Sequence, residues 1–279
     1  MVTKEDSINI VKNFELYESY LRIENLFNLM NIADNDSMEA IYFSLKNDPC
    51  ELVRHEAAFC LGETASLEAR DVLIDVLKSD DKSLVVIHEC LMSLGTIGEK
   101  NDLDFIKTFL TDNRFEVKCS AQIAIDRILQ QEDFEKDIIL KKEDYISELF
   151  DYKKSNQNRR IQILFQLMLI GDEHSTRAIY RCFIEDICRV VRHEAAFCLG
   201  EIASDLSVEL LKDAISCEKT PIAIHEGLFA LGTSGKKGVL SFIEKYLEHE
   251  DYVISQSALI AKQRIEILKN PYRGVDYFK

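Results

Sequence analysis

The sequence predicts an all-α protein, a solenoid of helical hairpins in two pseudo-symmetric halves that face a central site. Three observations predict this fold. The eleven residues VRHEAAFCLGE at 53–63 recur unchanged at 191–201, 138 positions later. Within the halves, a related His-Glu motif recurs after 33 and after 32 residues, a period typical of stacked helix pairs. Only 3 prolines and 10 glycines occur in 279 residues, which favours helices with short connections.

The repeated segments are expected to be helices. The second motif reads IHECLMSLG at 87–95 and returns as IHEGLFALG at 224–232, 137 positions later. Between the motifs, 71–77 and 206–215 place apolar residues at i, i+1, i+4 and i+5, as an amphipathic helix does. Helical patterning with a period in the thirties predicts HEAT-type repeats.

The halves are expected to be joined by a charged connector. The first half should span 1–131 and the second 146–269, with the acid- and lysine-rich connector at 132–145 being partly helical. Pro271 breaks the helical pattern, so 270–279 is expected to be an irregular tail.

Composition favours a reduced, cytoplasmic protein, and we expect a monomer. No stretch approaches about 18 uncharged apolar residues, so no membrane span is expected, and the N-terminus has no apolar signal segment. The eight cysteines form no CxxC pair, which predicts neither disulfides nor a cysteine metal site. The net charge of −15 disfavours nucleic acid as a ligand. It favours a cationic partner, although acidic surfaces also aid solubility.

The four motif helices share only a His-Glu pair and a Leu-Gly pair five and six residues after the Glu. The Leu-Gly pair has a structural role, because the leucine packs inward and the glycine lets a neighbouring helix approach or ends the helix. On a helical wheel, Val53, Ala57 and Leu61 share one face. His55 and Glu56 project from the other side, which in a solenoid lines the concave surface.

The His-Glu pairs predict a metal site. Four of the 6 histidines lie in these His-Glu pairs, and the pairs are kept where the two motifs of a half otherwise differ. Four imidazoles and four carboxylates without thiolate suit two iron or manganese ions, with zinc possible, and facing helices of di-iron proteins offer such ligands. The reaction expected is oxygen activation followed by hydroxylation of a carbon. The residue four after each His is apolar, which favours a water-poor pocket: Phe59, Met92, Phe197 and Phe229.

These motifs resemble those of deoxyhypusine hydroxylases. The resemblance covers essentially the whole chain, including the opening Met-Val-Thr and the run RRIQILFQLMLIG at 159–171, which is similar to the helix that opens the family's second half. It implies hydroxylation of the deoxyhypusine side chain on the precursor of translation initiation factor 5A, which forms hypusine. That precursor would be the partner, two ferrous ions the cofactor and O₂ the co-substrate.

The resemblance also implies a role for each residue of the site. Glu56 and Glu194 would bind the substrate, whose amine cations need carboxylates not neutralised by metal. The sequence departs from the family pattern at Ile87 and Ile224, which replace a basic residue, and at Met92 and Phe229, which replace a glutamate. The implied iron ligands are His55, His88 and Glu89 in the first half, and His193, His225 and Glu226 in the second.

Three alternatives stay open at this point. A related di-metal oxygenase could act on another amine substrate. A HEAT scaffold could bind protein partners without catalysis. A zinc or manganese hydrolase could use a metal-bound water. Metal analysis separates iron, no metal and redox-silent ions.

Overall fold

The computed structural model describes residues 2–64, 66–130, 141–236 and 238–269, and within them the chain is helical without strands. The chain divides into two compact units, Met1–Asp137 and Ile138–Lys279. The predicted all-α fold is therefore confirmed. The tail at 270–279 and most of the connector, 132–140, lie outside the described residues.

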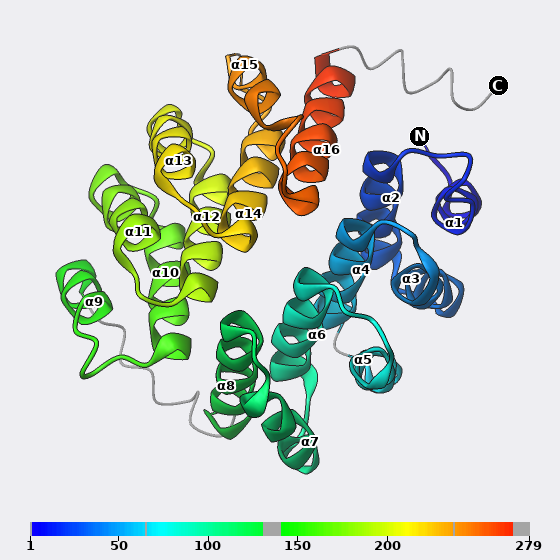
Figure 1. The fold of residues 1–279 in the computed structure, drawn as a ribbon, viewed down its shortest axis with the longest axis horizontal. Coiled ribbons are helices and arrows are strands. Elements are labelled where there is room, and N and C mark those ends of the chain that lie inside the picture. Colours follow the sequence, from blue (N-terminus) through cyan, green and yellow to red (C-terminus); the bar gives the residue numbers. More distant parts are fainter. Residues whose placement is uncertain (1, 65, 131–140, 237, 270–279) are drawn as a thin grey trace. The chain divides into compact units, whose positions relative to one another are not determined.

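Unit 1 consists of two layers of helices, which alternate along the chain (Figure 1). In the layer with the His-Glu motifs, successive helices pack side by side, as in a solenoid. The layer that carries the His-Glu motifs, here the motif layer, contains α2 (Ser19–Ile32), α4 (Glu51–Thr64), α6 (Leu84–Ile97) and α8 (Phe115–Gln130). The flanking layer contains α1 (Lys4–Lys12), α3 (Asn35–Asn47), α5 (Leu67–Lys78) and α7 (Leu103–Lys107), the last between the short 3₁₀ helices η1 (Lys100–Asp102) and η2 (Thr108–Thr111).

Unit 2 repeats this arrangement. The helices expected at 71–77 and 206–215 are both present, as α5 in unit 1 and as α13 (Asp205–Cys217) in unit 2. The motif layer contains α10 (Gln157–Ile170), α12 (Arg189–Ile202), α14 (Pro221–Thr233) and α16 (Tyr252–Lys269). The flanking layer contains α9 (Lys142–Leu149), α11 (Glu173–Glu185), α13 (Asp205–Cys217) and α15 (Leu240–Ile243), followed by η4 (Glu244–Tyr246).

Helix α9 crosses the expected end of the partly helical connector. It begins at Lys142, so it runs through position 145, where the connector was expected to end. Glu143 and Asp144 lie in its first turn, where acidic side chains interact favourably with the helix dipole. The acidic residues that suggested a connector therefore stabilise the N-terminal turn of α9. As a result, one helix precedes the run at 159–171, which was expected to open the second half.

Capping side chains fix where several helices begin. The Asp34 carboxylate accepts the backbone N–H of Ser37 at 2.9 Å, and Asp172 accepts that of Ser175 at 2.8 Å. These bonds satisfy backbone donors that the first turn of a helix leaves without an intrahelical acceptor. Serines cap three further helices in the same way, at Ser66, Ser83 and Ser204.

The motif glycines allow close helix approach. A Cβ added to Gly62 would lie 2.5 Å from Oγ of Ser93 on α6, and one on Gly95 would lie 2.7 Å from Cα of Ala124 on α8. Both distances are too short for carbon, so only glycine fits this spacing. Of the two expected roles, close approach is the one observed. Unit 2 repeats the contacts, with Gly200 against Ala230 and Gly232 against Ala261.

All eight cysteines are free thiols, and seven of them are buried. Burial raises the pKa of Cys60, Cys90 and Cys198 well above the ordinary thiol value. These thiols therefore stay protonated at neutral pH and behave as small hydrophobic side chains. The described helices include no candidate for a membrane span.

Candidate metal centre

The four His-Glu pairs lie in the middle of α4, α6, α12 and α14, and all eight residues are at most 8% exposed. The apolar face predicted for α4 is confirmed, since Val53, Ala57 and Leu61 are fully buried. The His-Glu face of the same helix is buried as well, so these groups do not line a solvated surface. Buried imidazoles and carboxylates need partners or a metal, because removing a polar group from water is costly.

In unit 1, two imidazoles and one carboxylate converge. Nε2 of His55 lies 3.6 Å from Oε2 of Glu89, and Nε2 of His88 lies 4.0 Å from the same oxygen. The two imidazole rings are stacked, with centroids 6.4 Å apart. One repeat period carries the chain from α4 to α6, so the two histidines lie side by side on neighbouring helices.

Unit 2 repeats the geometry. Nε2 of His193 lies 3.5 Å from Oε2 of Glu226, and the rings of His193 and His225 have centroids 6.2 Å apart. One ligand atom from each of these three residues lies within 4.8 Å of the others. The structure thus brings together, within each unit, the three residues named as ligands from the sequence.

The remaining two glutamates contact the other side of an imidazole. Oε1 of Glu56 lies 3.2 Å from Nδ1 of His55, and Oε1 of Glu194 lies 3.3 Å from Nδ1 of His193. An ionised carboxylate only accepts hydrogen bonds, so Nδ1 is the donor in these pairs. The lone pair of each ring is then on Nε2, the atom that lies near Glu89 or Glu226. Glu56 and Glu194 therefore orient a histidine, a contact that the motif alone did not reveal.

At the second histidine of each unit, a serine hydroxyl contacts Nδ1 instead of a glutamate carboxylate. Nδ1 of His88 lies 2.8 Å from Oγ of Ser120 on α8, and Nδ1 of His225 lies 2.8 Å from Oγ of Ser257 on α16. Sequence reasoning missed these serines because α8 and α16 contain no His-Glu pair. One further step of the repeat would have found them, since each serine lies 32 residues after its histidine.

The other end of each motif layer carries a buried ion pair. Arg22 on α2 binds Asp48 through two bonds of 2.6 and 2.9 Å, and Arg160 on α10 binds Asp186 through bonds of 2.7 and 3.1 Å. All four side chains are at most 4% exposed. These arginines lie 33 residues before the first His of their unit, so the same repeat step leads to them.

Three of the four positions that depart from the family pattern are buried, and the fourth packs against the second histidine of unit 2. Ile87 and Ile224 are buried, as is Met92. The ring of Phe229 packs edge-on against that of His225, with centroids 4.7 Å apart. Phe229 therefore places an apolar ring beside the His225 imidazole.

The donor set fits iron. Each unit offers two imidazoles and one carboxylate, the ligand combination of many non-haem ferrous oxygenases. The Nε2 atoms of all four histidines are buried, and those of His55 and His193 lie 3.6 and 3.5 Å from a glutamate oxygen. No thiolate competes for the metal, because the neighbouring cysteines stay protonated.

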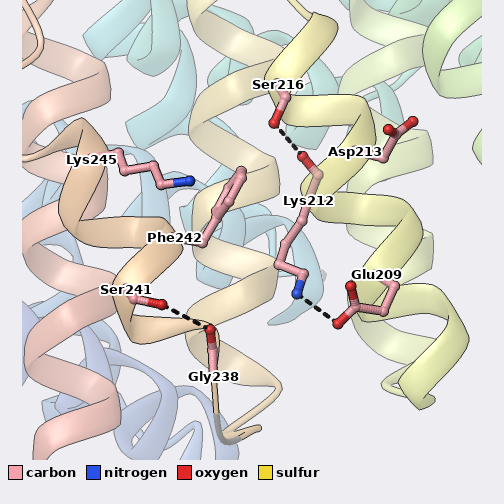
Figure 2. A pocket seen from close by; sticks show the side chains of 8 residues that line it. All are labelled: Glu209, Lys212, Asp213, Ser216, Gly238, Ser241, Phe242 and Lys245. Carbon is pink, nitrogen blue, oxygen red and sulfur yellow. Dashed lines mark hydrogen bonds and ion pairs between the residues drawn. The ribbon is translucent and has the colours of Figure 1, made fainter.

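A separate pocket opens on the flanking layer of unit 2 (Figure 2). Its volume is about 380 Å³, and its Lys212 ammonium group is bound to Glu209 at 2.6 Å. No His-Glu residue lines it, so this pocket is distinct from the candidate metal centre. The lining residues are Glu209, Lys212, Asp213, Ser216, Gly238, Ser241, Phe242 and Lys245.

Comparison with known proteins agrees with the repeat architecture. The family model of HEAT repeats matches residues 39–126, and that of the PBS lyase HEAT-like repeat matches residues 191–217. The chain is also similar to human deoxyhypusine hydroxylase solved in complex with glycerol. That match has a TM-score of 0.81 at 22% identity and covers 94% of this chain and 97% of the human one. At this identity, the match establishes the fold.

Sequence relatives extend the comparison over most of the chain. A deoxyhypusine hydroxylase of Kluyveromyces lactis is 30% identical over 276 residues, covering 88% of this chain and 85% of the relative. Those of Candida albicans and Drosophila melanogaster are each 27% identical, and cover 88% and 90% of this chain and 86% and 87% of the relatives.

Proposed function

The chain belongs to the deoxyhypusine hydroxylase family, and we propose that each of its two His-His-Glu trios holds one of the two iron ions used in the reaction. The enzymes of this family are di-iron monooxygenases that hydroxylate deoxyhypusine. The observation that carries the assignment is the convergence of two imidazoles on one carboxylate in each unit. The proposed ligands are His55, His88 and Glu89 for one ion, and His193, His225 and Glu226 for the other.

Bound iron supplies the reduction of O₂ and the transfer of one oxygen atom to carbon. The chain itself orients the ligands. The carboxylates of Glu56 and Glu194 accept the Nδ1–H of the first histidines, which directs Nε2 toward the metal. Burial of the whole group keeps bulk water away, which strengthens each of these charge-assisted contacts.

Substrate binding is proposed for the same two glutamates. Deoxyhypusine is an aminobutyl-extended lysine, so it carries amine cations. Each glutamate uses one oxygen for a histidine, and its second oxygen is then the acceptor proposed for an ammonium group. The chain's net charge of −15 also attracts a cationic arm. The proposed partner is the precursor of translation initiation factor 5A in its deoxyhypusine form, and we propose the cytoplasm as the compartment because the substrate is a translation factor.

The test is iron reconstitution under anaerobic conditions, followed by a deoxyhypusine-bearing protein and O₂. We expect two irons per chain and conversion to hypusine, detected as the mass of one added oxygen atom. His88→Ala and His225→Ala should each lose one iron. Folded protein that binds no iron, or only redox-silent ions, would contradict the proposal and favour the scaffold or the hydrolase.

Glu56→Gln separates the two roles of that residue. The amide oxygen still accepts from Nδ1 of His55, but the negative charge that attracts the amine is removed. We expect iron to be retained and KM for the deoxyhypusine protein to rise. Loss of iron in this variant would show that Glu56 serves the metal rather than the substrate. Glu63, another glutamate of α4 outside the site, provides the matched Glu→Gln control.

A further inference from the structure

The serines at the ends of the two motif layers have no role in the proposed reaction as described so far. We infer that Ser120 and Ser257 are positioning residues that hold Nδ1–H of His88 and His225, so that Nε2 is the nitrogen presented to the metal. The reason for this positioning rests on the proposed function, because it concerns metal binding. The histidine tautomer itself can be measured in the protein without metal.

The direction of the hydrogen bonds follows from the serine hydroxyls. A hydroxyl has a single hydrogen. Oγ of Ser120 lies 2.8 Å from the backbone carbonyl of Glu116 and Oγ of Ser257 lies 2.6 Å from that of Val253, and a carbonyl can only accept. Each hydroxyl therefore donates to its own helix. Toward the histidine it can only accept, so Nδ1 carries the hydrogen and Nε2 carries the lone pair.

The contacts are rigid as well as directional. Ser120, Ser257, His88 and His225 are each 0% exposed, so water does not compete for these bonds. Each bond joins neighbouring helices of the motif layer, α8 to α6 and α16 to α14, and these pairs are closely packed. Helices α8 and α16 carry none of the proposed metal ligands. Each of them fixes the orientation of the histidine on the preceding helix of the motif layer.

The two histidines of a unit are thus held by different groups. A carboxylate holds His55 and His193, whereas a neutral hydroxyl holds His88 and His225. The hydroxyl fixes the tautomer without adding negative charge beside the metal. This leaves one carboxylate per trio as a ligand and one behind the first histidine.

The first test uses protein without metal. Long-range ¹H–¹⁵N spectra of histidine side chains, recorded at about pH 8 where an ordinary imidazole is neutral, distinguish a protonated Nδ1 from a protonated Nε2. We expect His88 and His225 to be Nδ1–H tautomers. Ser120→Ala should move only His88, and Ser257→Ala only His225, toward the Nε2–H form. A wild-type protein with Nε2–H at these histidines would overturn the inference.

The second test measures ferrous iron affinity by anaerobic titration against a chelator. Removing a group that orients a metal-ligating histidine weakens metal binding by about 10–100-fold. We expect that loss for one of the two irons in Ser120→Ala and for the other in Ser257→Ala. Ser120→Thr and Ser257→Thr keep the hydroxyl and should restore the tautomer and the affinity. Unchanged affinity in both folded alanine variants would contradict the inference.

Buried serines outside the site provide matched controls. Ser44 on α3 and Ser175 on α11 are also 0% exposed, and their hydroxyls form no hydrogen bond with described residues. Ser44→Ala and Ser175→Ala should leave the spectra and both iron affinities unchanged. If wild-type protein binds no iron, the proposed function fails, and the spectra of the metal-free protein still decide the role of the serines.

Discussion

The two units share one ladder of buried groups on successive motif helices but differ in the side chains around it. The distances along the ladder are nearly equal: the His–Ser bond is 2.8 Å in both units, and the shortest Arg–Asp bond is 2.6 Å in one and 2.7 Å in the other. Positions that only fill space differ more freely. The ladder consists of Arg22, His55, His88 and Ser120 in unit 1, and of Arg160, His193, His225 and Ser257 in unit 2.

One difference reaches the proposed ligands. Oγ of Ser93 in unit 1 lies 3.2 Å from Oε1 of Glu89 and 2.9 Å from the carbonyl of Ala58. Unit 2 has Ala230 at the equivalent position, so Glu226 has no such hydroxyl there. The comparison therefore teaches that both units hold their second histidine through the same serine contact. Only in unit 1 does a further serine hydroxyl contact the glutamate of the trio.

The largest effect on stability is expected for the arginines at the start of each ladder. Arg22→Ala or Arg160→Ala would leave a buried carboxylate without its cation, which typically costs about 3–5 kcal/mol. We expect a loss of that size for either variant, measured as the free energy of unfolding in urea. Equal losses would support equivalent units. A loss below about 1 kcal/mol, the range of exposed ion pairs, would show that the pair does not stabilise its unit.

The ladder also marks how far the sequence could predict the structure. The His-Glu repeat was sufficient to predict the helices, the period and the burial of the apolar face. The three residues that meet in each unit were implied by the family resemblance. Arg22 and Ser120 were missed because a lone arginine or serine carries no motif and has meaning only through its place in the repeat. The paired contacts of Glu56 depend on side-chain rotamers, which a sequence pattern does not specify.

Overpacking at the helix crossings should have the next largest effect. Gly62→Ala would place a methyl group 2.5 Å from Oγ of Ser93, and Gly200→Ala would place one 2.5 Å from Cβ of Ala230. Neighbouring backbone atoms are close behind, so the helices must separate at a cost of about 1–3 kcal/mol. We expect similar losses in urea unfolding for both. A loss in only one variant would show that this crossing is looser in the other unit.

Removing the hydroxyl that distinguishes the units should have a smaller effect. Ser93→Ala gives unit 1 the residue that unit 2 already has. The single hydroxyl hydrogen of Ser93 is shared between the Ala58 carbonyl and Glu89, so its contribution to Glu89 is smaller than that of a full hydrogen bond to a charged group, about 1.5–3 kcal/mol. We expect ferrous iron to bind the unit 1 trio about tenfold more weakly, equivalent to about 1.4 kcal/mol. The titration is made in the His225→Ala background, which leaves the unit 1 trio intact. Unchanged affinity would mean that Ser93 supports packing alone.

The smallest effect concerns the ends of α2 and α10. Ala33 ends α2 in the left-handed region at φ 53°, while Gly171 ends α10 at φ 61°, and each cap N–H bonds the carbonyl of a leucine. Since alanine is strained at positive φ, Ala33→Gly should stabilise the protein by about 0.5–1 kcal/mol and Gly171→Ala should destabilise it by about as much. Differential scanning calorimetry measures both effects as shifts of the melting temperature Tm. Opposite signs would show that the two caps are equivalent and that the end of α2 tolerates a strain which the end of α10 avoids. Shifts of one sign would place the difference in the surrounding contacts instead.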